Sequence, residues 1–258
     1  VRPRTSLTRI RVPFGTAPRN RILTTLGSQE GHLMAIVVIT GTNTDVGKTY
    51  TTASVARSAI EQGVRVTVCK PAQTGEPAGS GDLSTVQKLL GADAVHDYVE
   101  FARYPEPLAP NISARRAGMA QLNLDETARK IRELDAPGEL VLVEGAGGLL
   151  VRIAEEWTIA DLAAKLCAPI LVVTSTGLGS LNCAELTVEV AQHRGITVLG
   201  LIGGIYPDDP DLATRLNVEE FEAVCGVSLL GLVPQGQAAL ADDSRVVQML
   251  SGLLATTK

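Results

Sequence analysis

The sequence predicts an α/β fold in which a doubly wound, mostly parallel sheet forms a single domain. Short apolar runs alternate with helix-like segments from Met34 to the C-terminus, and this rhythm is typical of parallel sheets with helices on both faces. The chain of 258 residues is 45% hydrophobic but only 3% aromatic, so Val, Leu, Ile and Ala must supply most of its core. Strands buried on both faces have this composition.

The order of the elements follows from the spacing of apolar residues. Apolar runs predict strands at residues 35–40, 65–70, 140–144, 170–175, 198–205 and 229–233. Segments with helical spacing predict helices at 49–62, 83–90, 124–134, 159–166, 181–194, 213–224 and 244–254. Residues 74–81, which are rich in glycine, and 104–110, with three prolines, are predicted to be flexible loops. No repeat or linker divides residues 34–258, which we predict to be one domain.

The most informative motif follows the first predicted strand. Residues 41–49 read Gly-Thr-Asn-Thr-Asp-Val-Gly-Lys-Thr, which matches the phosphate-binding loop G-x-x-x-x-G-K-[ST]. Between a strand and a helix, successive backbone N–H groups and the helix N-terminus form a site for anions. Lys48 can reach the β- and γ-phosphates, and the Thr49 hydroxyl can ligate Mg²⁺. The sequence therefore predicts a nucleotide-binding domain resembling the P-loop NTPases.

Two charged residues stand where buried strands end, the edge of a parallel sheet at which ligands collect. Glu144 is followed by Gly-Ala-Gly-Gly, which lets a ligand approach the backbone closely. A carboxylate at this place helps to hold Mg²⁺ in phosphate-loop proteins, although Asp is the commoner residue. Lys70 ends another buried strand, where a lysine is unfavourable unless it faces an anion. Both residues are candidates for the chemistry of the site.

The charge is distributed unevenly along the chain. Residues 1–33 contain six arginines, no lysine and one acidic residue, which makes this segment +5 and leaves −10 for the rest of a chain whose total is −5. The acidic body argues against nucleic acid as a partner. We expect residues 1–33 to be an unstructured basic extension rather than a targeting signal. Alternatively, the native translation start is Met34 and the start of this sequence was assigned upstream of it.

Composition also bears on the compartment. No run of about 18 apolar residues is present, so we expect no membrane-spanning helix. The four cysteines are scattered and form no C-x-x-C pair, which together with an ATP-binding loop predicts reduced, mostly buried thiols in a cytoplasmic protein. The three histidines are too dispersed for a histidine-rich metal site.

Three motifs occur together in one order and spacing: Gly-Thr-x-Thr-x-Val-Gly-Lys-Thr at 41–49, Cys-Lys-Pro-x-Gln-Thr-Gly at 69–75, and Val-Glu-Gly-Ala-Gly-Gly at 143–148. In this combination they resemble the dethiobiotin synthetases of the biotin pathway. The likeness runs from Met34 to about Gln237. That family closes the ureido ring of dethiobiotin from 7,8-diaminononanoate, CO₂ and a nucleoside triphosphate with Mg²⁺.

The resemblance implies a role for each motif. Lys48 and Lys70 would stabilise the negative oxygens of the reaction, and Thr74 would contact the substrate. The triphosphate would be held by Asp45, Val46, Gly47, Lys48, Thr49 and Tyr50. Mg²⁺ would be ligated by Thr49, Asp82 and Glu144. The site would also be lined by Glu144, Gly145, Ala146 and Gly147.

The resemblance also implies a homodimer and a place for the base. The distal carboxylate of the substrate would be received, from the neighbouring subunit, by Gly179, Ser180, Leu181 and Asn182. Many members place an asparagine at the end of the fifth predicted strand, where its amide can pair with adenine, and Gly204 occupies that position here. Base contacts would then come from the backbone of Gly204, Ile205, Pro234, Gln235 and Gly236. We therefore expect other triphosphates to replace ATP.

The chemistry of the residues agrees with this family. CO₂ adds to an amine to give a carbamate, phosphorylation gives a mixed anhydride, and the second amine displaces phosphate. Both charged steps need cations around developing negative oxygens, which Lys48, Lys70 and Mg²⁺ would supply. No Ser-His-Asp or Cys-His set is evident in the sequence, and none is required.

Two alternatives remain open on the sequence alone. An amidoligase of corrin biosynthesis would need a glutaminase region with a reactive cysteine, and too little chain follows the sixth predicted strand for one. A partitioning ATPase, acting as a nucleotide-driven switch, would carry an additional lysine early in the phosphate loop, where this chain has Thr42-Asn43-Thr44-Asp45. Polymer- or DNA-stimulated ATP turnover without any diamine would favour the switch.

Overall fold

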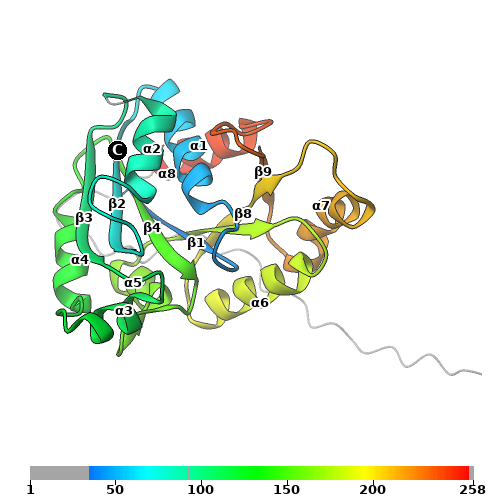
Figure 1. The fold of residues 1–258 in the computed structure, drawn as a ribbon. Helices are drawn as coiled ribbons and strands as arrows, with labels where there is room; N and C mark the ends of the chain where they lie inside the picture. The colour runs from blue at the N-terminus through cyan, green and yellow to red at the C-terminus, as the bar shows by residue number, and fades with distance from the viewer. Residues whose placement is uncertain (1–34, 92, 256–258) are drawn as a thin grey trace, which may run out of the picture.

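A seven-stranded parallel sheet lies at the centre of the computed structural model, which describes residues 35–91 and 93–255 (Figure 1). Every pair of neighbouring strands in this sheet is parallel. Across the sheet the strands follow the order β3 (Asp97–Tyr104), β2 (Arg65–Thr74), β4 (Glu139–Gly148), β1 (Ile36–Gly41), β7 (Ile170–Ser175), β8 (Val198–Tyr206) and β9 (Leu229–Pro234). The predicted α/β class and parallel sheet are confirmed.

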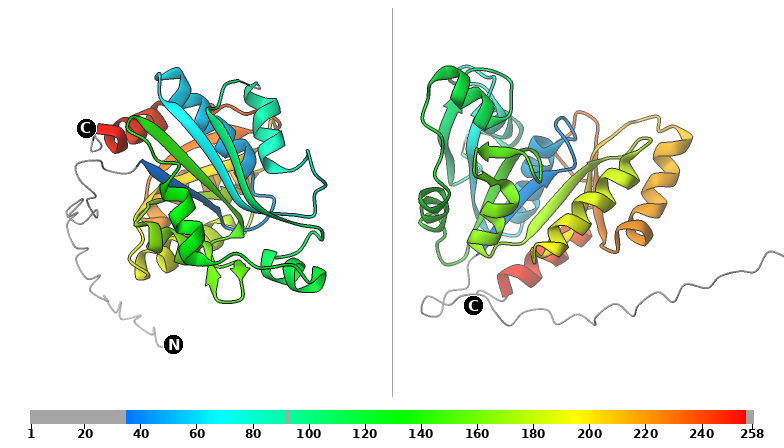
Figure 2. Two further views of the ribbon diagram at one scale, coloured as in Figure 1. Left: turned by 90° about the vertical axis from the view of Figure 1, so that its left-hand side faces the viewer. Right: turned by 90° about the horizontal axis from the view of Figure 1, so that it is seen from below.

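Helices cover both faces of the sheet (Figure 2). One face packs against α1 (Lys48–Glu61), α2 (Asp82–Leu90) and α8 (Ser244–Ala255). The other packs against α3 (Pro110–Ala117), α4 (Leu124–Arg132), α5 (Ile159–Leu166), α6 (Ser180–His193) and α7 (Leu212–Cys225). Successive side chains of a strand point to opposite faces, so Ile36 and Val38 of β1 enter one core while Val37 and Ile39 enter the other. This double burial explains the continuous apolar runs of the sequence.

The fold places the phosphate-binding loop at the point where the chain changes direction across the sheet. From β1 the chain passes through α1 to β2, which lies on one side of β1 with β4 between them. The later strands β7, β8 and β9 lie on the other side of β1. Ligands of doubly wound folds bind outside the carboxyl ends of the strands at such a switch point.

Several elements were not expected from the sequence. The edge strand β3 carries Glu100 and Arg103, which interrupt the apolar run that marks a buried strand. Helix α3 starts inside the predicted proline-rich loop, because Pro110 occupies its first turn, where a missing N–H is tolerated. A small hairpin of β5 (Arg152–Ala154) and β6 (Trp157–Thr158) precedes α5.

The structure also bears on the expectations about thiols and membranes. All four cysteines are free thiols, but only Cys69 and Cys225 are buried while Cys167 and Cys183 are exposed, so the expectation of mostly buried thiols was wrong for two of them. Among the residues described, no helix combines the length and apolar character needed to cross a membrane. The expected basic extension at 1–33 lies outside the described residues.

Candidate active site

Glycine shapes the end of the phosphate-binding loop between β1 and α1. Gly47 has a φ of 93°, and a Cβ atom at this residue would lie 2.1 Å from the carbonyl oxygen of Gly204. A side chain is therefore excluded twice, by the backbone conformation and by the close contact. No side chain caps the helix that begins at Lys48. Its first N–H groups thus remain available to an anion.

Lys48 is buried below the loop, with 7% of its surface exposed. Its Nζ atom donates a hydrogen bond to the backbone oxygen of Asn43 at 2.9 Å. Burial lowers the pKa of Lys48, and the positive charge of Lys70 lowers this pKa further. Both effects disfavour the charged amine as the structure stands, so a bound phosphate would stabilise it.

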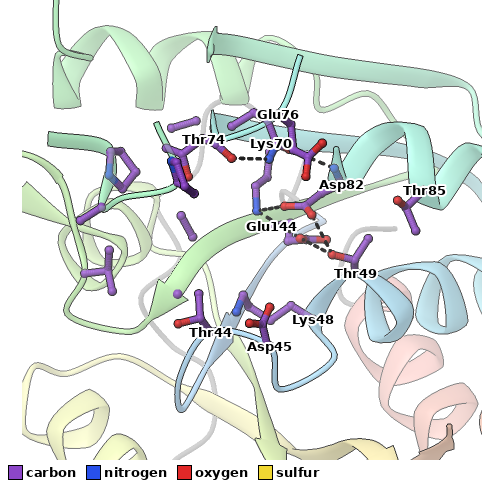
Figure 3. A pocket seen from close by; sticks show the side chains of 18 of the residues that line it. Thr44, Asp45, Lys48, Thr49, Lys70, Thr74, Glu76, Asp82, Thr85 and Glu144 are labelled. Atoms are coloured by element: carbon purple, nitrogen blue, oxygen red, sulfur yellow. Dashed lines mark hydrogen bonds and ion pairs between the residues drawn. The ribbon is translucent and has the colours of Figure 1, made fainter. Parts of the chain in front are cut away.

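Lys70 is held between two carboxylates at the carboxyl end of the sheet (Figure 3). Its Nζ atom lies 2.5 Å from Oδ2 of Asp82 and 3.1 Å from Oε1 of Glu144, and it donates to the backbone oxygen of Gly145 at 2.8 Å. Burial opposes the charge of this lysine, but the two carboxylates outweigh burial and raise the pKa of Lys70. The residue is a fixed, buried cation.

The pKa values of the two carboxylates beside Lys70 shift in opposite directions. Burial opposes the charge of Asp82, but Lys70 outweighs burial, and the pKa of Asp82 is lowered. Burial raises the pKa of Glu144; the charge of Lys70 works against this effect and the charge of Asp82 adds to it. A further cation beside Glu144 would favour its ionised form.

The hydroxyl of Thr49 meets both carboxylates. Its Oγ1 atom lies 3.0 Å from Oε1 of Glu144 and 3.2 Å from Oδ1 of Asp82. Mg²⁺ prefers oxygen ligands and is commonly held by one or two carboxylates together with phosphate oxygens. The three oxygens fit such an ion. Within residues 35–91 and 93–255 no group of three or more His, Cys, Asp and Glu side chains is placed to hold a metal by itself.

These residues border a cavity of about 810 Å³, a volume within the usual range for small-molecule sites. Figure 3 shows Lys48, Asp45 and Thr44 of the phosphate-binding loop on one side of this cavity. Lys70, Thr74 and Glu76 lie on the opposite side, and residues 107–110 complete the wall. Two buried cations therefore face a common space from different elements.

The three motifs that are far apart in the sequence meet in this cavity. The predicted site residues that line it are Asp45, Gly47, Lys48, Thr49, Tyr50, Lys70, Thr74, Asp82, Glu144, Ala146, Gly147 and Ile205. Val46 instead packs into the core, with 4% exposed, and Gly204 is buried against the loop. Gly145 contributes its carbonyl oxygen to Lys70.

Two predicted segments lie outside the lining of the cavity. Residues 234–236 follow β9, and the N–H of Gln235 donates to the carbonyl oxygen of Tyr206 at 2.8 Å, which places this segment beside the end of β8. Residues 179–182 form the start of α6, where Gly179 has a φ of 89° and Ser180 is buried. They do not border the cavity of their own chain.

Comparison with known proteins decides the family. A family model described as an AAA domain matches residues 36–240. The ATP-dependent dethiobiotin synthetase BioD of Corynebacterium diphtheriae is 60% identical over 82% of this chain and 93% of the relative. The chain belongs to the ATP-dependent dethiobiotin synthetase family. The dethiobiotin synthetases of Corynebacterium efficiens and Rhodococcus jostii are 55% and 51% identical, over 81% and 82% of this chain and 94% and 91% of the relatives.

Membership of the dethiobiotin synthetase family confirms the resemblance seen in the three motifs and the prediction of an ATP-dependent ligase. It favours this function over an amidoligase or a partitioning switch. A chain of the MinC:MinD cell division protein complex of Aquifex aeolicus has a similar fold, with a TM-score of 0.51 over 85% of this chain and 96% of that chain. At 13% identity this likeness concerns the fold alone.

Two polar residues that hydrogen-bond to Glu144 and to the backbone of Asp82 were not assigned from the sequence. The Thr52 hydroxyl donates to Oε2 of Glu144 at 2.7 Å, and the backbone N–H of Asp82 donates to Oε1 of Gln73 at 2.9 Å. Thr52 lies three residues after Thr49, so helical spacing puts both on one face of α1. Gln73 lies within the second motif, and its partner nine residues along the chain could not be read from the motif itself.

Proposed function

We propose that the cavity binds ATP and Mg²⁺ along the phosphate-binding loop and 7,8-diaminononanoate along the wall formed by Lys70 and Thr74. CO₂ then joins the diamine, and the ureido ring of dethiobiotin closes. The observation that carries this proposal is the position of Lys70, a buried cation 2.5 Å from Asp82 that faces Lys48 across the cavity. A kinase-like phosphate site alone would not need a second lysine on the substrate side.

The reaction requires stabilised oxygens rather than a nucleophilic side chain. One amine adds to CO₂ and gives a carbamate, which accepts the γ-phosphoryl group and becomes a mixed anhydride. The second amine attacks the carbonyl carbon, expels phosphate and loses a proton. Lys70 stabilises the carbamate and the transferring phosphoryl oxygens, and Lys48 stabilises the triphosphate; removal of one such group lowers rates by about 10²–10³.

Three oxygens would hold Mg²⁺ in this arrangement: those of Thr49, Asp82 and Glu144. The bound ion would neutralise the charge of the triphosphate. Thr52 orients the carboxylate of Glu144 through a hydrogen bond of 2.7 Å, and Gln73 holds the backbone N–H of Asp82 at 2.9 Å, which fixes the start of α2. These two side chains therefore serve the metal site without facing the ion themselves.

The base of the nucleotide is proposed to lie at the ends of β8 and β9. Ile205 is 39% exposed and borders the cavity, and residues 234–236 lie next to it. Gly204 offers no side chain, so backbone groups would make the polar contacts with the base. Recognition of this kind discriminates weakly between bases.

We further propose a homodimer in which the start of α6 receives the substrate carboxylate of the partner subunit. Free N–H groups and the helix dipole favour an anion there. Large apolar side chains are exposed near this helix, since Leu150, Leu178 and Leu186 are 45%, 90% and 53% exposed. Such exposure is typical of an interface. The substitution Leu178→Asp should shift sedimentation toward the monomer and reduce turnover, whereas a fully active monomer would exclude a shared site.

The proposed location is the cytoplasm, which supplies ATP and keeps thiols reduced. A stoichiometric assay tests the proposed reaction. Purified protein with ATP, Mg²⁺ and bicarbonate should release one phosphate for each diaminononanoate added and little without it. ATP hydrolysis that is independent of the diamine would overturn the proposal.

A further inference from the structure

Glu76 is a carboxylate of the cavity wall to which the reaction above gives no task. It lies in the loop between β2 and α2 and borders the cavity together with Lys70 and Thr74 (Figure 3). Its side of the cavity is the one opposite the phosphate-binding loop. A charged group at this place lies on the side proposed for the substrate, away from the phosphate-binding loop.

Among the described residues, no cation pairs with the carboxylate of Glu76. Four acidic residues border the cavity within the described part of the chain: Asp45, Glu76, Asp82 and Glu144. Asp82 and Glu144 both pair with Lys70. Asp45 belongs to the phosphate-binding loop, where its charge acts on Lys48. Glu76 accepts a hydrogen bond from a neutral hydroxyl instead, that of Ser80 at 2.8 Å.

The loop that carries Glu76 is anchored from the edge strand. Arg103 of β3 donates from Nη1 to the backbone oxygens of Glu76 and Pro77 at 3.0 and 2.8 Å. The other edge of the same guanidinium binds the Glu100 carboxylate in a bidentate manner at 2.9 and 2.7 Å. The loop was predicted to be flexible from its glycines. Its fixation at Glu76 lowers the entropy that the carboxylate would lose on binding a ligand.

We propose that Glu76 binds an ammonium group of the substrate, through a charge-assisted hydrogen bond. This inference rests on the proposed function, because the diamine is the cation that enters the cavity. Asp82 and Glu144 are already engaged by Lys70, whereas Glu76 supplies an unengaged negative charge on the side proposed for the substrate. Glu76 thus contributes to the selection of a diamine over a molecule with one amine.

The first test compares Glu76→Gln with the wild type. Glutamine keeps the shape and a polar partner for Ser80 but removes the charge. The KM for diaminononanoate should rise about tenfold, as expected for the loss of a hydrogen bond to a charged group, while the KM for ATP should change little. Glu133→Gln is the control, because it removes an exposed carboxylate that pairs with Arg129 on α4. An unchanged KM for the diamine in Glu76→Gln would overturn the proposal.

A second test isolates the contact between Glu76 and an amine. Calorimetry measures the binding of the diamine and of the two analogues that lack either the 7-amino or the 8-amino group. In the wild type, removal of one of these amines should weaken binding about tenfold, and in Glu76→Gln the same removal should have little effect. Equal losses in both proteins for both analogues would overturn the proposal.

The two tests separate this inference from the proposed function. A wild-type protein that neither binds nor converts the diamine would contradict the function itself. A wild-type protein that converts the diamine normally, with Glu76→Gln equal to it in KM and in the amine comparison, would contradict only the assignment of Glu76.

Discussion

Gly47 and Gly204 pack backbone against backbone, although 157 positions separate them along the chain. A Cβ atom on Gly47 would lie 2.1 Å from the oxygen of Gly204, and a Cβ atom on Gly204 would lie 2.2 Å from the oxygen of Val46. This contact sets the position of the phosphate-binding loop against the end of β8. Neither residue can carry a side chain unless the loop moves.

The substitution Gly204→Ala should therefore disturb nucleotide binding. Overpacking of this kind destabilises a protein by about 1–3 kcal/mol, and a displaced loop should raise the KM for ATP. Thermal unfolding and ATP kinetics check both effects. Gly252→Ala on α8 is the matched control, because its added Cβ would have no described atom within 4 Å apart from its neighbours in the same helix. If Gly204→Ala matches this control, the contact does not position the loop.

The same contact bears on the base. An asparagine at 204, as the resemblance places it in many members, has no room beside Val46 while the loop stays in place. We predict weak base selectivity, because loss of a paired amide removes about 1–3 kcal/mol of discrimination. Comparison of kcat/KM for the four triphosphates should put CTP or GTP within about tenfold of ATP, since one decade is 1.4 kcal/mol. A preference for ATP above about a hundredfold corresponds to twice the free energy of one decade. It would show that another residue recognises adenine.

Lys70→Ala should lower kcat by about 10²–10³ while the protein remains folded. The variant also leaves Asp82 and Glu144 without their buried cation, which destabilises the fold, so circular dichroism must accompany the kinetics. Lys165→Ala removes a half-exposed lysine that pairs with Asp125 and should keep full activity. Turnover close to that of the wild type in Lys70→Ala would remove Lys70 from the mechanism.

Asp82→Asn should raise the Mg²⁺ concentration needed for half-maximal activity by about tenfold or more. A capping role does not account for this residue, because Asp82 is the first residue of α2 and Gly81 precedes it without a side-chain cap. Its carboxylate points instead to Lys70 and Thr49. A titration with Mg²⁺ that coincides with that of the wild type would leave Asp82 only its ion pair with Lys70.

The sequence predicted the residues whose signal is local. Lys48 and Thr49 stand in a short motif, and Lys70 and Glu144 each end an apolar run, so their meeting at one edge follows from a parallel sheet. The sequence could not predict the supports of these residues. Thr52 reaches the Glu144 carboxylate, and Gln73 reaches the backbone N–H of Asp82, through tertiary hydrogen bonds that no local pattern encodes.

There is also a physical reason why strand β3 was not predicted from the sequence. Strand β3 pairs on one side only, so its residues are half-buried and carry charges such as Glu100 and Arg103. The strand contributes to the site only through the folded structure, in which Arg103 anchors the loop that carries Glu76. Gly204 was assigned to the base from its strand end, whereas the structure shows its packing against Gly47.

The most direct test of the account is the fate of labelled bicarbonate. Purified protein with ATP, Mg²⁺, diaminononanoate and [¹⁴C]bicarbonate should place acid-stable label in a ring product, because a ureido carbonyl survives acid while a free carbamate loses CO₂. The rate at which acid-stable label is incorporated should fall about 10²–10³-fold in the Lys70→Ala variant. ATP consumption without acid-stable label in the wild-type reaction would contradict the central claim.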